Sequence, residues 1–121
     1  MSPITLGNTT VHIVSDGVFH LDGGALFGVV SKTLWRRRVR PDRKNRITMG
    51  LNCLLIQSGG KNILVDTGVG TKLSQRRKSI YGVRAGRLIT GLKGLGLEPQ
   101  DIHLVVLTHL HFDHAGGCTY L

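Results

Sequence analysis

The stretch Thr108-His109-Leu110-His111-Phe112-Asp113-His114-Ala115-Gly116-Gly117 places three histidines and an aspartate within six residues. Side chains two positions apart in an extended segment share a face, so His109 and His111 are predicted to converge on one metal ion. Asp113 shares that face if the extension continues, but His114 cannot. We therefore expect the backbone to turn near Asp113, with the small residues 115–117 allowing a turn or close packing. One short loop would then serve two neighbouring ions.

The ligand types and the position of this loop both fit a metal site. Imidazole and carboxylate suit Zn, Fe or Mn, and zinc is the first choice. Residues 102–107 are nearly all apolar apart from His103, which predicts a strand buried on both faces directly before the loop. Sites in α/β sheets gather at the carboxyl ends of strands. A surface loop with chance histidines explains this spacing less well. The isolated His12, His20 and His103 are expected to be structural or exposed.

The rest of the chain carries weaker patterns, which together indicate an α/β fold. Apolar runs around a Ser-Gly-Gly-Lys turn predict a β-hairpin. Apolar residues at helical spacing predict a helix, ended by Gly96. The expected elements are a strand over 10–14 with a turn at 15–17, a packed loop over 20–32, an exposed basic excursion over 36–46, a hairpin over 51–56 and 63–66, and a helix over 85–95.

Length and composition limit the class of protein. The chain has 121 residues, 40% hydrophobic and 19% charged, which indicates one globular domain at most. Its two cysteines, Cys53 and Cys118, make no disulfide framework, and we expect buried reduced thiols. The N-terminus has no secretory pattern and no apolar run reaches transmembrane length, so a cytoplasmic location is expected.

The net charge of +9 is concentrated in two basic clusters, over residues 36–46 and 76–87. Such clusters suit either a surface for nucleic acid or an acidic substrate, or an ordinary solvated loop surface. Basic runs alone are weak motifs, so the solvated surface is favoured and a nucleic-acid partner is the less favoured alternative. No membrane partner is expected, and the sequence predicts no oligomeric state.

A family resemblance rests on these same residues. The stretch 108–117 resembles the signature loop of the metallo-β-lactamase superfamily. Asn52-Cys53-Leu54-Leu55-Ile56 and Ile63-Leu64-Val65-Asp66-Thr67-Gly68 resemble the hairpin that precedes this loop, including its Asp-Thr-Gly turn. Ser15-Asp16-Gly17 and Leu21-Asp22-Gly23-Gly24-Ala25-Leu26-Phe27-Gly28 resemble the opening of the lactonase-like hydrolase branch. The resemblance spans nearly the whole chain.

The resemblance implies a fold and a set of metal ligands. Residues 1–121 would form a partial domain, the N-terminal half of an αβ/βα sandwich, with mainly one β-sheet and a covering helix. His109 and His111 would bind a first metal, and Asp113 and His114 a second. Asp66 would orient a ligating histidine, although an Asp that merely forms a turn is the alternative. Family members supply the remaining ligands after the signature loop, and this chain stops at Leu121.

The resemblance also implies an activity. Two zinc ions, with iron or manganese as alternatives, would activate a water as hydroxide in the intact domain, and Asp113 would help to orient this nucleophile. The favoured function is hydrolysis of a small ester or lactone, with acyl-homoserine lactones as candidate substrates. The alternatives are a glyoxalase-II-like thioesterase, then a nuclease, or a non-catalytic metal-binding fragment. The 121-residue piece alone is expected to be an inefficient hydrolase, since each ion would have only two ligands.

Overall fold

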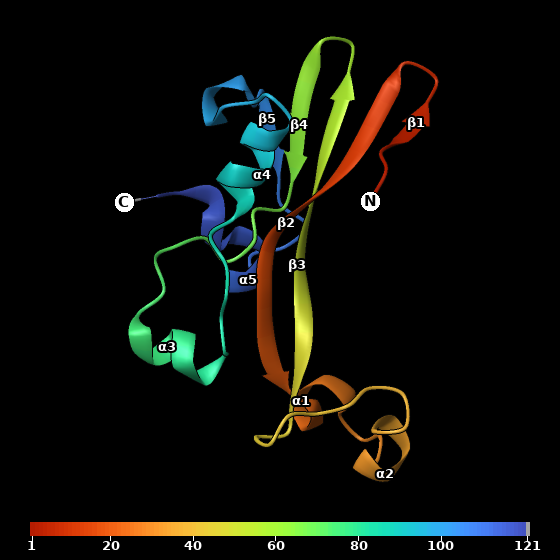
Figure 1. The fold of residues 1–121 in the computed structure, drawn as a ribbon, viewed down its shortest axis with the longest axis vertical. Coiled ribbons are helices and arrows are strands. Elements are labelled where there is room, and N and C mark those ends of the chain that lie inside the picture. Colours follow the sequence, from red (N-terminus) through yellow and green to blue (C-terminus); the bar gives the residue numbers. More distant parts are fainter. Residues whose placement is uncertain (121) are drawn as a thin grey trace.

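The computed structural model describes residues 1–120, and these form one five-stranded sheet with short helices beside it (Figure 1). Leu121, the last residue of the predicted partial domain, lies outside this range. The strands are β1 (Ile4–Leu6), β2 (Thr9–Asp22), β3 (Arg46–Ser58), β4 (Lys61–Val65) and β5 (Leu104–Val106), and the order in the sheet is the order in the chain. The α/β class predicted from the sequence is confirmed.

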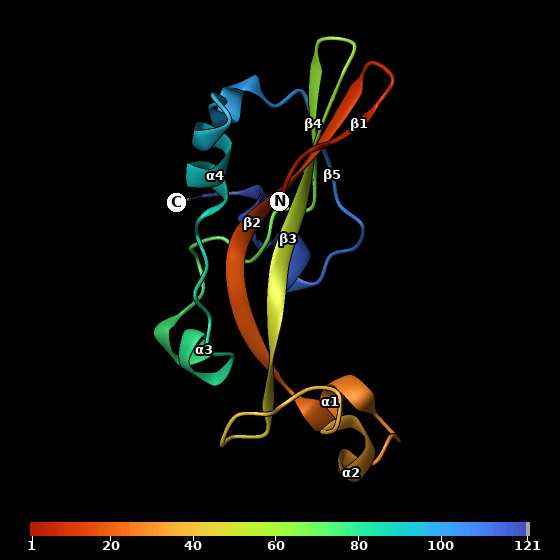
Figure 2. The same ribbon diagram turned by 45° about the vertical axis from the view of Figure 1, so that its right-hand side comes forward.

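The long antiparallel strands β2 and β3 are the frame of the sheet, and Figure 2 shows them as a twisted ribbon. The predicted hairpin is confirmed: Ser58 pairs with Lys61, and the turn between them is made by Gly59 and Gly60, with φ of 54° and 73°. Positive φ at both turn residues suits the right-handed twist of the strands, and glycine adopts it without a steric penalty. β5 then joins β4 in parallel.

A crossover through two helices, α3 (Gln75–Ile80) and α4 (Leu88–Gly94), connects β4 to β5, and both helices lie on one side of the β2–β3 ribbon (Figure 2). α4 lies within the predicted helix but begins three residues later. Gly86 has φ of 90°, which an α-helix does not accommodate. The helix ends at the expected place, since Gly96, with φ of 77°, follows the C-cap residue Leu95.

The main core lies between α4 and the strands β2, β3 and β4. Leu88 and Leu92 of the helix are each 2% exposed, and they pack on Leu55 and Leu64, which are paired neighbours in the sheet. Each fully buried leucine stabilises the fold by roughly 1.5–3 kcal/mol before the entropy of ordering is subtracted. Cys53 belongs to this core, as expected, whereas Cys118 is exposed, contrary to the prediction.

Two predictions for the N-terminal third were wrong. Residues 15–17 are not a turn that ends a strand: β2 continues through them with a bulge, where the register with β3 shifts between Ser15 and Gly17. The segment 20–32 is not one loop, because it contains the end of β2 and the helix α1 (Gly23–Phe27), and α2 (Lys32–Trp35) begins at its end. Asp22 and Ser31 cap these helices with their side chains, a signal that the glycine-rich composition obscured.

The prediction that the last strand is buried on both faces was also wrong. Leu104, Val105 and Val106 of β5 are 53%, 45% and 42% exposed. β5 is the edge strand, and an apolar cavity of about 400 Å³ separates it from α4, with Leu92 and Val105 among its lining residues. Among residues 1–120, none of the helices combines the length and the apolar character that a membrane span requires.

Candidate metal centre

The site is built where the parallel strands β4 and β5 end side by side. Asp66 follows β4 and Thr108 lies two residues after β5, so the two residues meet at the same edge. The Asp66 carboxylate accepts the Thr108 backbone N–H at 2.8 Å and its hydroxyl at 2.9 Å. The Asp66 N–H donates to the carbonyl of Val106 at 2.8 Å. These hydrogen bonds between Asp66 and the segment 106–108 hold the start of the predicted metal loop against the sheet.

The same segment holds the far end of the loop. The Thr67 backbone N–H and hydroxyl both donate to the carbonyl oxygen of His114, at 2.7 Å and 2.8 Å. The Asp66 Oδ2 atom lies 2.8 Å from Nδ1 of the His114 ring. Asp66 has a φ of 60°, which is uncommon for a residue other than glycine. This conformation accompanies the contacts from Asp66 to both ends of the loop.

The hydrogen-bond network assigns the tautomers of two histidines. A carboxylate oxygen only accepts, so Nδ1 of a neutral His114 carries the proton and its Nε2 has the free lone pair. Nδ1 of His109 lies 3.1 Å from the Thr108 hydroxyl, which already donates to Asp66 and therefore accepts from this ring. Both rings thus present Nε2, the nitrogen that is free to bind a metal.

The four predicted metal ligands share one patch. The ring centroid of His109 lies 4.6 Å from that of His111 and 4.0 Å from that of His114, and the Asp113 carboxylate lies beside His114. His109 and His111 are exposed, and the other two are half-buried. Among residues 1–120, however, no three His, Cys, Asp or Glu side chains are arranged to hold one ion. Their assignment as ligands stays a prediction.

One contact in this patch is compatible with a bound cation. Nε2 of His114 lies 3.2 Å from Oδ2 of Asp113, while Nδ1 of the same ring is engaged by Asp66. With the neutral tautomer, a lone pair and a carboxylate oxygen face each other, and two acceptors at this distance repel. A shared proton or a metal ion between them removes the repulsion. An imidazole nitrogen and a carboxylate oxygen are ordinary ligands of zinc, iron and manganese.

The predicted turn near Asp113 is confirmed. The helix α5 (Phe112–Ala115) begins directly after His111, whose carbonyl accepts the N–H groups of His114 and Ala115 at 3.0 Å and 2.9 Å. Asp113 therefore does not continue the extended face that His109 and His111 begin. Phe112, the first residue of the helix, packs against Phe19 and Tyr81 with ring centroids 5.7 Å and 5.0 Å away. Sequence reasoning assigned Phe112 no role, although it anchors the loop in a second apolar core.

The predicted close packing after the loop is confirmed. A Cβ atom on Gly116 would collide with the carbonyl oxygen of Val69, and one on Gly117 with that of Thr67. The Gly117 N–H donates to the carbonyl of Gly68 at 3.2 Å. The segments 67–70 and 116–117 thus lie backbone to backbone, and any larger residue at the two glycines would separate them.

Asp16 supports this arrangement, and sequence reasoning missed it. Its side chain is fully buried at the β2 bulge. Oδ2 accepts the N–H groups of Val69 and Gly70, both at 3.0 Å, and Oδ1 those of Gly86 and Leu88, at 3.1 Å and 3.0 Å. Four backbone donors compensate the buried charge. Asp16 thus holds the segment on which the metal loop packs.

The electrostatics of Asp66 favour its ionised form. Burial raises the pKa of its carboxyl group, but hydrogen bonds from His114 and Thr108 lower it by more, so the pKa lies below the ordinary value. An ionised carboxylate at this position is the partner that holds a histidine ring in one tautomer and orientation. The predicted role of Asp66 therefore has a geometric basis, and it stays a prediction.

Comparison with known proteins identifies the family. Residues 48–121 match the model of the metallo-beta-lactamase superfamily, which is more than half of the chain. The chain belongs to this superfamily. Two curated relatives are an N-acyl homoserine lactonase from Bacillus cereus, 32% identical over 84 residues, and the N-acyl homoserine lactonase AiiB from Agrobacterium fabrum, 38% identical over 84 residues. These matches cover 60% and 61% of this chain, but only 34% and 30% of the relatives.

Solved structures agree with this result over more of the chain. A "probable metal-dependent hydrolase" from Staphylococcus aureus superimposes with a TM-score of 0.90 at 36% identity, covering 96% of this chain and 43% of that protein. AidC, a dizinc quorum-quenching lactonase solved with a product, N-hexanoyl-L-homoserine, gives a TM-score of 0.73 at 30% identity, covering 96% and 38%. The chain thus spans about a third of the length of its curated relatives, and about two-fifths of these structures.

Proposed function

We propose that this chain carries part of the metal centre of a hydrolase that cleaves a small ester or lactone. The observation that carries the proposal is the position of the His114 ring between two carboxylates, Asp66 on Nδ1 and Asp113 on Nε2. A cation shared between Nε2 of His114 and the Asp113 carboxylate would remove the repulsion between these two acceptors. The names of the relatives, which are lactonases, favour a lactone over a thioester or a nucleic acid as substrate.

The residues have separate roles in this proposal. His109 and His111 would hold one ion, and Asp113 and His114 a second. Bound divalent zinc would supply Lewis-acid activation of water and of the substrate carbonyl oxygen near neutral pH. Asp66 keeps the His114 ring in the tautomer that leaves Nε2 free, and the Thr108 hydroxyl does the same for His109. Asp113, whose side chain is only partly buried, could also orient the attacking water.

The candidate substrate class is the acyl-homoserine lactones, with a dinuclear zinc centre in the complete domain. A catalytic zinc commonly has three protein ligands, and the chain offers two to each ion. The same count supports the second candidate, a metal-binding piece without turnover. The small-molecule substrate, the metal and the cytoplasmic location remain predictions.

The test measures metal binding first and turnover second. Zn²⁺ binding by the 121-residue chain is followed by calorimetry, with Asp113→Ala as the test variant and His103→Ala as the control. We expect the first change to weaken binding and the second to leave it unchanged, since His103 lies outside the patch. Hydrolysis of N-hexanoyl-homoserine lactone is then compared between the chain and a protein that extends to the length of its relatives.

Three results would contradict parts of the proposal. Equal zinc affinity in the Asp113→Ala variant would show that the loop is not the metal site. A full-length protein that binds zinc but cleaves no lactone or ester would reject the substrate class. Efficient turnover by the 121-residue chain would show that two ligands for each ion suffice, or that other residues complete the site.

A further inference from the structure

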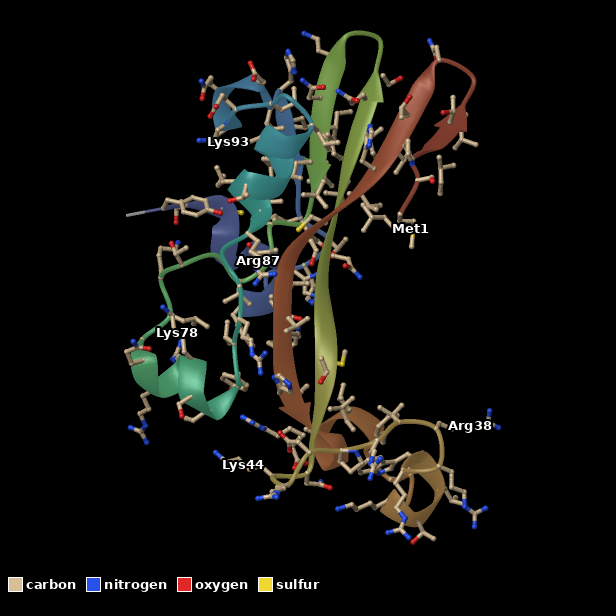
Figure 3. The ribbon with its side chains drawn as sticks, in the orientation of Figure 1. Met1, Arg38, Lys44, Lys78, Arg87 and Lys93 are labelled. Atoms are coloured by element: carbon tan, nitrogen blue, oxygen red, sulfur yellow. The ribbon has the colours of Figure 1, made fainter. Side chains whose placement is uncertain are left out.

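Basic residues that are far apart in the sequence gather at one end of the molecule. Figure 3 shows Arg38, Lys44 and Lys78 at the end where α1, α2 and α3 lie, with Lys93 at the opposite end. The basic residues at this end belong to both basic clusters, which are about thirty residues apart in the sequence. The two clusters therefore contribute to one surface.

Direct contacts join the two segments that form this surface. The guanidinium of Arg46, at the start of β3, donates to the carbonyl oxygens of Ser79 and Ile80 at the end of α3, at 3.2 Å and 3.0 Å. Because these bonds fix one segment against the other, the basic side chains occupy a defined region. We call residues 22–46 and 74–84 together the basic end.

The basic end holds nearly all the excess charge of the protein. It contains twelve of the 16 lysines and arginines but only two of the seven acidic residues, which gives it a net charge of +10. The rest of the chain has a net charge of −1. Both acidic residues are already engaged: Asp22 caps α1, and Asp42 pairs with Arg46 at 2.9 Å. This asymmetry leaves most of the cations of the basic end facing solvent.

Exposed aliphatic side chains lie among these cations. Val29 is fully exposed and Leu34 is 57% exposed, and Val30, Val39 and Ile80 are also exposed. Exposed aliphatic groups among Lys and Arg are the combination by which amphipathic helices bind at the interface of an anionic bilayer. There, Lys and Arg contact lipid headgroups while the aliphatic groups enter the headgroup–acyl boundary.

The aromatic residues of this end argue against nucleic acid. Phe27 and Trp35 stack on each other with ring centroids 5.0 Å apart, and Trp35 is 5% exposed. Tyr81 packs against Phe112 of the metal loop. The rings at this end are thus engaged with other aromatic rings, which leaves less of their surface for stacking of a base. Its helices have five, four and six residues, too short to fill a major groove.

We propose that the basic end binds the surface of an anionic phospholipid membrane. The proposal is independent of the hydrolase function, because it rests on residues outside the metal loop. It departs from the sequence-based expectation of no membrane partner, since binding at the surface needs no spanning helix. The attraction acts within the Debye length, about 8 Å at physiological ionic strength, so it is sensitive to salt.

The test is co-sedimentation of the 121-residue chain with vesicles. Vesicles of phosphatidylcholine alone are compared with vesicles of equal parts phosphatidylcholine and phosphatidylglycerol, at low and high salt. Each cation near an anionic surface strengthens binding about fivefold, so Arg37→Gln with Arg38→Gln should weaken it roughly 25-fold. The control, Lys61→Gln with Lys93→Gln, removes the same charge at the opposite end and should change binding less than about twofold.

A second pair of variants tests the apolar contribution. Val29→Ser with Leu34→Ser keeps the charge and removes exposed aliphatic side chains, and should weaken vesicle binding at least roughly tenfold. Equal binding to neutral vesicles, equal loss in the control pair, or no vesicle binding at all would overturn the proposal. Binding to a fluorescent DNA duplex that is lost in the arginine pair and kept in the Val29/Leu34 pair, without vesicle binding, would assign the surface to nucleic acid.

Discussion

Replacing Asp16 by asparagine is the sharpest test of how this fold supports its metal loop. The carboxylate accepts four backbone N–H groups at 3.0–3.1 Å. Asparagine has nearly the same shape but only one acceptor oxygen, so its NH₂ group faces two N–H donors that lose their partner. Hydrogen bonds to a charged group contribute about 1.5–3 kcal/mol each, so Asp16→Asn should destabilise the fold by roughly 3–6 kcal/mol. A neutral amide costs less to bury than a charged carboxylate, so the expected loss of stability is close to about 3 kcal/mol.

The assay is urea unfolding of the 121-residue chain, followed by circular dichroism. With a slope of about 2 kcal/mol per molar urea, the midpoint should fall by at least roughly 1.5 M. Asp101→Asn is the matched control, because Asp101 is exposed and accepts one N–H, that of Glu98, at 2.8 Å. Asparagine keeps an acceptor oxygen for this N–H, so the control should change stability by less than about 0.5 kcal/mol.

Amide hydrogen exchange shows where the damage occurs. In Asp16→Asn, protection should fall at one donor pair, Val69 and Gly70 or Gly86 and Leu88, before the rest of the sheet opens. A loss of stability below about 0.5 kcal/mol, the range of ordinary surface substitutions, would refute the reasoning. Complete unfolding of the variant without urea would mean that the loss exceeds the stability of the chain, in agreement with the expectation.

Three further changes test other residues. Asp113→Ala should lower kcat/KM of a protein extended to the length of its relatives at least tenfold more than His103→Ala, because only the first change removes a proposed metal ligand; equal losses would reject the assignment. Asp66→Asn should weaken zinc binding about 10–100-fold, measured by competition with a chelating dye, and unchanged affinity would mean that Asp66 only forms a turn. Burial raises the pKa of Cys53 to about 12, so this thiol should resist alkylation at pH 8, whereas the exposed Cys118 should react; mass spectrometry of the labelled chain decides.

The features that sequence reasoning predicted are those encoded by neighbouring residues. The hairpin of β3 and β4 follows from two apolar runs and a Gly59-Gly60 turn only two residues long. The proximity of His109, His111 and His114 follows from their spacing within one loop, whatever the exact turn. Such local patterns need no knowledge of the rest of the fold.

Three of the features that it missed depend on residues far away in the chain. The partners of Asp16 lie 53 to 72 positions later, so its neighbours in sequence suggest only a turn. Phe112 looks like a spacer between predicted metal ligands, yet it packs against Phe19 and Tyr81 at the turn of the loop. The exposure of β5 depends on how closely α4 approaches it, which the apolar composition of the strand does not report.

The parallel pairing of β4 with β5 has a consequence for the order in which the chain folds. The β3–β4 hairpin closes a very short loop, whereas Asn62 and His103, beside the first β4–β5 pair, are 41 positions apart. Closing the longer loop costs more chain entropy, so β5 is expected to dock after the hairpin has formed. Exposed on its faces and paired on one edge, β5 is also held by fewer contacts. The histidine loop that continues from it should therefore open to solvent while β2, β3 and β4 stay paired, on a timescale faster than global unfolding.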